Sequence, residues 1–185
     1  VYRSVGNLQL DYAIPFLPAL HANLNLGYDI SHSVQHNLLE PDSPLSYKEN
    51  KKTGLGQDER LSQLKRNLLL DFYLNYKQDF EAIQSRLDAT AGYSWQRFYK
   101  DGETRTTLMP DGETWFESSY TDHLQLISFF GRVNYSYKDT YLFTVTLRGD
   151  ATSRFSKDNR WGAFPAVALG WKIINEPFME EATSV

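Results

Sequence analysis

The feature that most constrains the fold is a strict alternation of apolar and polar residues through two adjacent segments, 127–137 and 141–150. One set of alternate positions is apolar or aromatic: Ile127, Phe129, Gly131, Val133, Tyr135, Tyr137, then Tyr141, Phe143, Val145 and Leu147. The other set is mostly polar: Ser128, Arg132, Asn134, Ser136, then Thr144, Thr146, Arg148 and Asp150. Because successive side chains of a β-strand point to opposite faces, the pattern predicts a hairpin turning at Lys138 and Asp139. Such a two-faced hairpin is typical of a sheet that meets lipid on one side and water on the other.

The same alternation recurs along the chain and predicts seven strands. Their expected ranges are 4–12, 20–30, 66–77, 85–98, 125–138, 141–151 and 163–174. We expect the polar positions to face a water-filled lumen, the leading candidates being Asn25, Asp29, Asp71, Asn75, Asp88, Gln96, Arg132, Asn134 and Arg148. The fold class predicted is therefore all-β, an antiparallel up-and-down transmembrane β-barrel segment.

The predicted connections alternate in length. Those at 13–19, 78–84 and 139–140 are short, whereas those at 31–65, 99–124 and 152–162 are long. Outer-membrane barrels have short periplasmic turns and long extracellular loops, so the alternation also predicts the direction of each strand. With this direction, aromatic residues fall at both membrane interfaces, as barrel girdles require.

Composition narrows the function classes. No run approaches the roughly 20 apolar residues of a membrane helix, although transmembrane strands escape such a test because only alternate residues are apolar. The net charge of −4 and the lack of a basic run argue against nucleic-acid binding. The chain has no cysteine, which excludes disulfides, thiolate metal sites and cysteine nucleophiles.

Five stretches carry a family resemblance: FLPALHANLNLGYD (16–29), LLLDFYLNYK (68–77), RLDATAGYSWQ (86–96), GRVNYSYKDTYLFTVTLRGDATSRF (131–155) and NRWGAFPAVALGW (159–171). Together they resemble the central barrel region of SusC/RagA-type TonB-linked outer-membrane transporters. The departure is small, since residues 149–153 read Gly-Asp-Ala-Thr-Ser where the family usually has Asp-Gly-Ser-Ser.

The resemblance implies a much larger barrel, of about 22 strands with a plugged lumen. It implies an importer of oligosaccharides or peptides in the outer membrane of a Gram-negative bacterium of the Bacteroidetes type. The implied partners are outer-membrane lipid, a SusD-like surface lipoprotein, and TonB acting through the plug. We expect residues 1–185 to be a partial barrel domain, with neither the plug nor the TonB box in this chain. The substrate is left undetermined.

The basic loop that begins at Arg148 has two interpretations. Arg154, Arg160 and Trp161 would contact a ligand or a lid protein at the outer rim. Alternatively, Asp150 and Asp158 pair with the arginines and Trp161 fixes the loop. The second interpretation is favoured, because mixed charges at a strand end usually set the shape of a loop.

Metal, cofactor and catalytic sites are not predicted. His32 and His36 stand four residues apart, but Ser33 occupies the position where a zinc protease carries its glutamate, and no third ligand is evident. The repeated Asp-Gly-Glu-Thr at 101–104 and 111–114 is better explained by two surface turns than by a calcium site. Paired carboxylates drawn from Asp71, Asp88 and Asp150 would suit a glycosidase, but their regular alternation has a simpler cause.

The main rival hypothesis is a soluble all-β carbohydrate-binding module, with a glycan-cleaving enzyme as a distant third. A soluble module requires the apolar stripes to pack into one dry core, with residues such as Leu26, Phe72, Phe129, Val145 and Leu169 converging.

Overall fold

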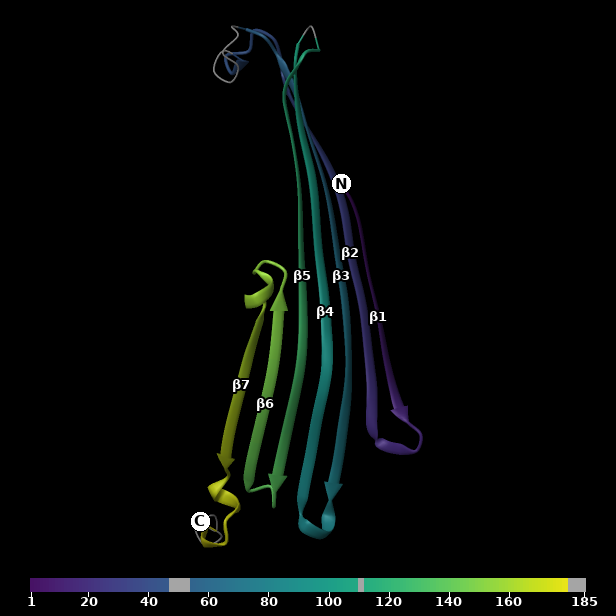
Figure 1. Cartoon of the computed structure of the whole chain (residues 1–185), viewed down its shortest axis with the longest axis vertical. Helices are drawn as coiled ribbons and strands as arrows, with labels where there is room; N and C mark the ends of the chain where they lie inside the picture. Colours follow the sequence, from purple (N-terminus) through teal and green to yellow (C-terminus); the bar gives the residue numbers. More distant parts are fainter. Residues whose placement is uncertain (47–53, 110–111, 180–185) are drawn as a thin grey trace. The chain divides into compact units, whose positions relative to one another are not determined.

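The computed structural model describes residues 1–46, 54–109 and 112–179. The chain forms one antiparallel seven-stranded sheet in which the strands follow each other in sequence order (Figure 1). The strands are β1 (Tyr2–Ile14), β2 (Leu17–Leu39), β3 (Gln57–Phe80), β4 (Ser85–Leu108), β5 (Thr114–Tyr137), β6 (Tyr141–Thr152) and β7 (Trp161–Trp171). Short 3-10 turns lie at η1 (Glu81–Ile83), η2 (Lys157–Asn159), η3 (Ile173–Asn175) and η4 (Pro177–Met179). A search of the described residues finds no helix with the length and apolar character to cross a bilayer.

All seven predicted strands are present, but β2, β3, β4 and β5 are much longer than predicted. Most of the expected loops 31–65 and 99–124 belongs to β2, β3, β4 and β5, so the connections shrink to 40–56 and 109–113. The expected alternation of short and long connections is therefore wrong for the β4–β5 link, which is nearly as short as that at 81–84. The added strand segments carry polar residues on both faces, and a strand without an apolar stripe gives no period-two signal.

Two smaller predictions are also wrong, because they depended on the predicted loop boundaries. His32 and His36 lie in β2 rather than in a loop, and Asp101–Thr104 lies in β4 rather than in a turn. The second copy of that tetrapeptide begins at residue 111, outside the described residues.

The β5–β6 hairpin turns where the sequence predicts. Lys138 and Asp139 have φ values of 52° and 50°, and Thr140 N donates to Tyr137 O at 3.0 Å. Positive φ at both central residues matches the twist of antiparallel strands. The turn sets the register that places Asn134 opposite Thr144 and Val133 opposite Val145.

The sheet has no apolar core of the kind a soluble module needs. Leu108 is the sole buried hydrophobic residue in the described part of the chain. Leu169 is 80% exposed and Phe129 is 53% exposed, and Leu26 and Phe72 are also exposed. Those side chains do not converge, so the structure contradicts the expectation attached to the soluble rival.

The chain divides into two compact units. The first comprises Val1–Gly6, Tyr28–Leu68 and Arg97–Leu124, and the second comprises Asn7–Gly27, Leu69–Gln96 and Gln125–Val185. Each unit is therefore a set of strand segments.

Candidate functional surface

One face of the second unit is a hydrogen-bonded polar surface, here called the polar face. Asn75 Nδ2 donates to Asp88 Oδ1 at 2.9 Å and to Thr90 Oγ1 at 2.7 Å. Asp71 accepts from Ser94 Oγ at 2.5 Å and from Asn25 Nδ2 at 3.4 Å. Since neighbouring strands present alternate residues to one side, these contacts place side chains of β2, β3 and β4 on the same face.

The polar face continues over β5 and β6. Asn134 Oδ1 accepts from Arg132 Nε at 3.1 Å and from Thr144 Oγ1 at 3.0 Å. Arg148 Nε donates to Asp150 Oδ1 at 2.8 Å. The charges on this face are partly neutralised within it, leaving amide, hydroxyl and carboxylate groups for a ligand.

The structure brings four of the predicted residues into one cavity of about 540 Å³. Its lining includes Asn75, Asp88, Arg132 and Asn134. Sequence reasoning missed other lining residues, namely Asp11, His21, Tyr73 and Lys77. The alternation could have found Asp11, because it lies between Leu10 and Tyr12 on a predicted strand. His21 Nδ1 lies 2.8 Å from Asp11 Oδ1, a contact that joins two of these lining residues.

A second cavity, of about 430 Å³, lies beside the β6–β7 connection. It brings together the predicted residues Arg148, Arg160 and Trp161, with Asp150 and the exposed Phe164 also in the lining. Arg160 Nε donates to Phe155 O at 3.0 Å, so this arginine holds the shape of its own loop.

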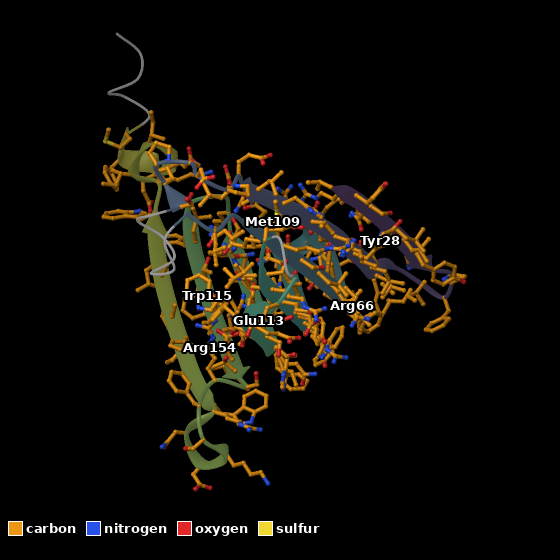
Figure 2. The ribbon with its side chains drawn as sticks, turned by 90° about the horizontal axis from the view of Figure 1, so that it is seen from above. Tyr28, Arg66, Met109, Glu113, Trp115 and Arg154 are labelled. Atoms are coloured by element: carbon orange, nitrogen blue, oxygen red, sulfur yellow. The ribbon has the colours of Figure 1, made fainter. Side chains whose placement is uncertain are left out.

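The interpretation of this loop as a self-contained network is confirmed in part. Arg148 pairs with Asp150, and Trp161 stacks on Phe129 with ring centroids 5.9 Å apart. Asp158 forms no ion pair with an arginine within 1–46, 54–109 and 112–179, so that half of the prediction is wrong. Side chains stand out from the ribbon in the view of Figure 2, where Arg154 is labelled.

Four of the nine predicted residues line neither cavity, namely Asn25, Asp29, Asp71 and Gln96. Asp29 belongs to the first unit, where its carboxylate accepts from Arg3 Nε at 2.9 Å and Arg3 Nη2 at 3.0 Å. Gln96 lies on β4 and lines neither cavity.

The opposite side of the second unit is the apolar face. A groove of about 410 Å³ on this face is lined mainly by Leu20, Leu74, Tyr76, Ala89, Ala91, Val133, Val145 and Leu147. Tyr93 and Phe129 also meet here, with ring centroids 5.1 Å apart. This face offers hydrocarbon contact and almost no hydrogen-bonding groups.

Beyond the apolar Tyr28, Ile30 and Leu68, the first unit carries polar contacts on both sides of its strands. On one side Asn37 Nδ2 donates to Glu59 Oε2 at 2.8 Å, and Gln63 Nε2 donates to Tyr120 Oη at 2.6 Å. On the other side His32 Nε2 lies 3.2 Å from Ser62 Oγ. Across the part of the chain that the structure describes, no group of three or more His, Asp or Glu side chains is placed to hold a metal ion.

The segment after β7 is tied to the β5–β6 turn. Lys172 Nζ donates to Asp139 Oδ1 at 2.8 Å, which lowers the pKa of the Asp139 carboxyl. Tyr141 Oη and Trp171 Nε1 donate to Glu176 Oε1 at 2.7 and 2.8 Å, and these hydrogen bonds lower the pKa of Glu176. These contacts therefore favour the charged form of both carboxylates, which is the form that accepts the bonds.

Comparison with known proteins adds an independent finding. Residues 2–179 match the family model described as TonB dependent receptor-like, β-barrel. The chain is 36% identical over 184 residues to TonB-dependent receptor SusC of Bacteroides thetaiotaomicron, covering 96% of this chain and 18% of that protein. It is 34% identical over 131 residues to TonB-dependent receptor P3 of Formosa agariphila, covering 64% of this chain and 13% of that protein.

A solved structure of the RagAB peptide transporter matches the fold. The TM-score is 0.83 at 19% identity, with 96% of this chain and 20% of that chain covered. The chain thus spans about a fifth of the length of these relatives.

Proposed function

Because this chain belongs to the TonB dependent receptor-like β-barrel family, and so to the bacterial outer membrane, we propose that it forms part of the wall of an energised importer. In this proposal the apolar face meets lipid and the polar face lines the lumen or contacts the plug. The observation that carries it is the division of chemistry between the two faces of a sheet without an apolar core. Large apolar side chains such as Leu169 remain 80% exposed, and lipid is the medium that removes that cost.

The nine lumen candidates are Asn25, Asp29, Asp71, Asn75, Asp88, Gln96, Arg132, Asn134 and Arg148. The proposal is supported by the second unit, which holds eight of them and where Asn75, Asp88, Arg132 and Asn134 line one cavity. Such a lining of amides, hydroxyls and paired charges suits a ligand with many hydrogen-bonding groups. We assign the substrate to the oligosaccharides or peptides, in keeping with the peptide named for RagAB.

Cysteine substitution in the full-length transporter tests the two faces, since this segment has no cysteine of its own. Asn75→Cys and Asn134→Cys should react with a bulky, water-soluble thiol reagent, and uptake of radiolabelled substrate should fall at least about tenfold because the path narrows. Matched controls on the adjacent opposite-facing positions, Leu74→Cys and Val133→Cys, should react only with a lipid-soluble reagent. Reaction of the second pair with the water-soluble reagent would refute the assignment.

The partners proposed are a SusD-like surface lipoprotein on the extracellular connections and TonB acting through the plug. Residues 47–53, within the predicted loop 31–65, lie outside the described residues. The β4–β5 hairpin offers Trp115 and Phe116, 49% and 51% exposed, beside its tip. Exposed aromatic residues of this kind often anchor protein interfaces. The variant Trp115→Ala with Phe116→Ala should weaken co-purification of the lipoprotein, while equal recovery would argue against this contact.

The proteins to which this chain is similar are named as receptors and transporters. We therefore propose no catalytic residue and no cofactor for this segment, and the outer-rim residues Arg154, Arg160 and Trp161 are proposed only as loop contacts.

A further inference from the structure

The apolar side of each long strand ends abruptly. On β3 the even-numbered residues from Tyr76 back to Leu68 are apolar or aromatic, and the next one is Arg66. On β4 the odd-numbered residues from Leu87 to Trp95 are apolar or aromatic, and the next one is Arg97. A tilted strand crosses the hydrocarbon core with about 9–11 residues, whereas β3 and β4 each have 24. Arg66 and Arg97 therefore stand at the level where the hydrocarbon ends and lipid headgroups begin.

Three arginines of the chain pair with a carboxylate, whereas Arg66 and Arg97 have no such partner among the described residues. Arg3 pairs with Asp29, Arg86 with Asp79 and Arg148 with Asp150. Within the described residues neither Arg66 nor Arg97 forms an ion pair, and both are exposed. The next acidic residue along that side of β4, Asp101, accepts a hydrogen bond from Thr121 Oγ1 at 2.7 Å. In the part of the chain that the structure describes, two positive charges on this side have no carboxylate partner.

An aromatic ring holds one of the two guanidinium groups in place. Arg66 Cζ lies 4.5 Å from the centroid of the Tyr99 ring, and Arg66 is labelled in Figure 2. Stacking of this kind fixes the plane of the guanidinium and leaves its N–H edge free for the paired hydrogen bonds that phosphate accepts. Because Tyr99 follows Arg97 by two residues, both arginines are on the same side of the strands.

Apolar side chains adjoin the charges on the same side of the first unit. Leu68, Tyr28 and Ile30 occupy the alternate positions of β3 and β2 that share this side, and all three are exposed. A lipid that places its phosphate on the arginines would lay its acyl chains along these residues. A soluble inorganic anion has the charge but no hydrocarbon to lay on these residues.

We infer that Arg66, Arg97 and Tyr99 form a binding site for the phosphate of an outer-leaflet lipid. The site lies on the membrane side of the wall, so it anchors the barrel at a fixed depth and takes no part in the import path. The positive charges of the two arginines favour phosphate, and the adjoining apolar residues favour a phosphate that is attached to a lipid.

The test uses the full-length transporter in nanodiscs and two double variants that each remove two positive charges. Arg66→Gln with Arg97→Gln alters the site, and Arg60→Gln with Arg105→Gln removes exposed arginines of the same strand sides farther along β3 and β4. Monophosphorylated lipid A and its dephosphorylated form are the probes, and native mass spectrometry measures the lipid retained per transporter. Folding of each variant is checked by the heat-dependent shift in gel mobility.

The unaltered protein should retain the phosphorylated lipid, and the site variant should bind it about tenfold more weakly, as expected when charge-assisted hydrogen bonds are lost. The control variant should match the unaltered protein, and Arg66→Lys should fall between them because an ammonium group cannot bind phosphate through two planar N–H groups. Inorganic phosphate should compete poorly. Equal retention by the site variant, or equal retention of the dephosphorylated lipid, would overturn the inference. Uptake should persist in the site variant, which separates this test from that of the import proposal.

Discussion

The two units of this chain share strands β1 to β5, yet they are built for different surroundings. In the second unit the even-numbered residues of β3 are apolar, as with Phe72 and Leu74, and the odd-numbered ones are polar, as with Asp71 and Asn75. In the first unit the even-numbered residues of the same strand include Asp58, Ser62 and Arg66. The comparison shows that the alternation assigns residues to the two faces of a strand. The polarity of each face indicates whether that face meets water or lipid.

The polar contacts follow the same division. The second unit has hydrogen-bond networks on one face and aromatic contacts such as Tyr93–Phe129 on the other. The first unit has polar contacts on both sides, such as Asn37–Glu59 on one and His32–Ser62 on the other. A sheet in water on both sides would look like the first unit, and a barrel wall in lipid would look like the second.

The largest expected effect comes from placing a charge on the apolar face. Leu74→Arg should lower the free energy of unfolding by ~2–4 kcal/mol, because a lipid-facing arginine near the bilayer midplane carries that cost. Ser119→Arg, at an exposed position of the first unit, should change it by less than about 0.5 kcal/mol. Denaturant titration of the full-length protein in phospholipid vesicles measures both. Equal losses of unfolding free energy for the two variants would contradict the inference that only the second unit has a lipid-facing side.

A smaller effect separates the units by how tightly their strands pack. A Cβ added at Gly92 would lie 2.5 Å from Tyr73 Cβ and 2.8 Å from Phe72 O, and a backbone oxygen cannot move aside. A Cβ added at Gly102 would meet the far end of the Tyr120 ring at 2.5 Å, and that ring can rotate away. Gly92→Ala should therefore destabilise the protein by ~1–3 kcal/mol and Gly102→Ala by less. The same denaturant titration measures both losses. A larger loss for Gly102→Ala than for Gly92→Ala would contradict the packing argument.

The smallest expected effect is a pH dependence at the turn that joins β5 to β6 in the second unit. The pKa values of Asp139 and Glu176 are lowered by Lys172 and by Tyr141 with Trp171, respectively. Their stabilising contribution is therefore complete above the ordinary carboxyl pKa and is lost as the pH falls through the lowered pKa. Asp139→Asn with Glu176→Gln should flatten the stability profile in that acidic range and leave its neutral part nearly parallel to that of the unaltered protein. An unchanged acidic profile would show that these contacts contribute nothing measurable.

Sequence reasoning recovered the second unit better than the first. The apolar stripe from Ile127 to Tyr137 made β5 and its hairpin partner predictable, and the turn at Lys138 followed from it. It failed over 31–39 and 114–124, where both faces of β2 and β5 are largely polar and the hydrophobic period disappears. Of the candidate surface, the sequence predicted Asn75, Asp88, Arg132 and Asn134 but missed Tyr73, an aromatic residue at a polar position.

The sequence by itself determined which residues share a face, because the two-residue period of a strand is local and needs no partner. Only the tertiary structure decided how far the strands extend and which charges are neutralised. Arg3 reaches Asp29 across the β1–β2 register, while Arg66 stacks on Tyr99 and forms no ion pair with any described residue. Such pairing depends on the neighbouring strand and its register, which bring together residues far apart in the chain.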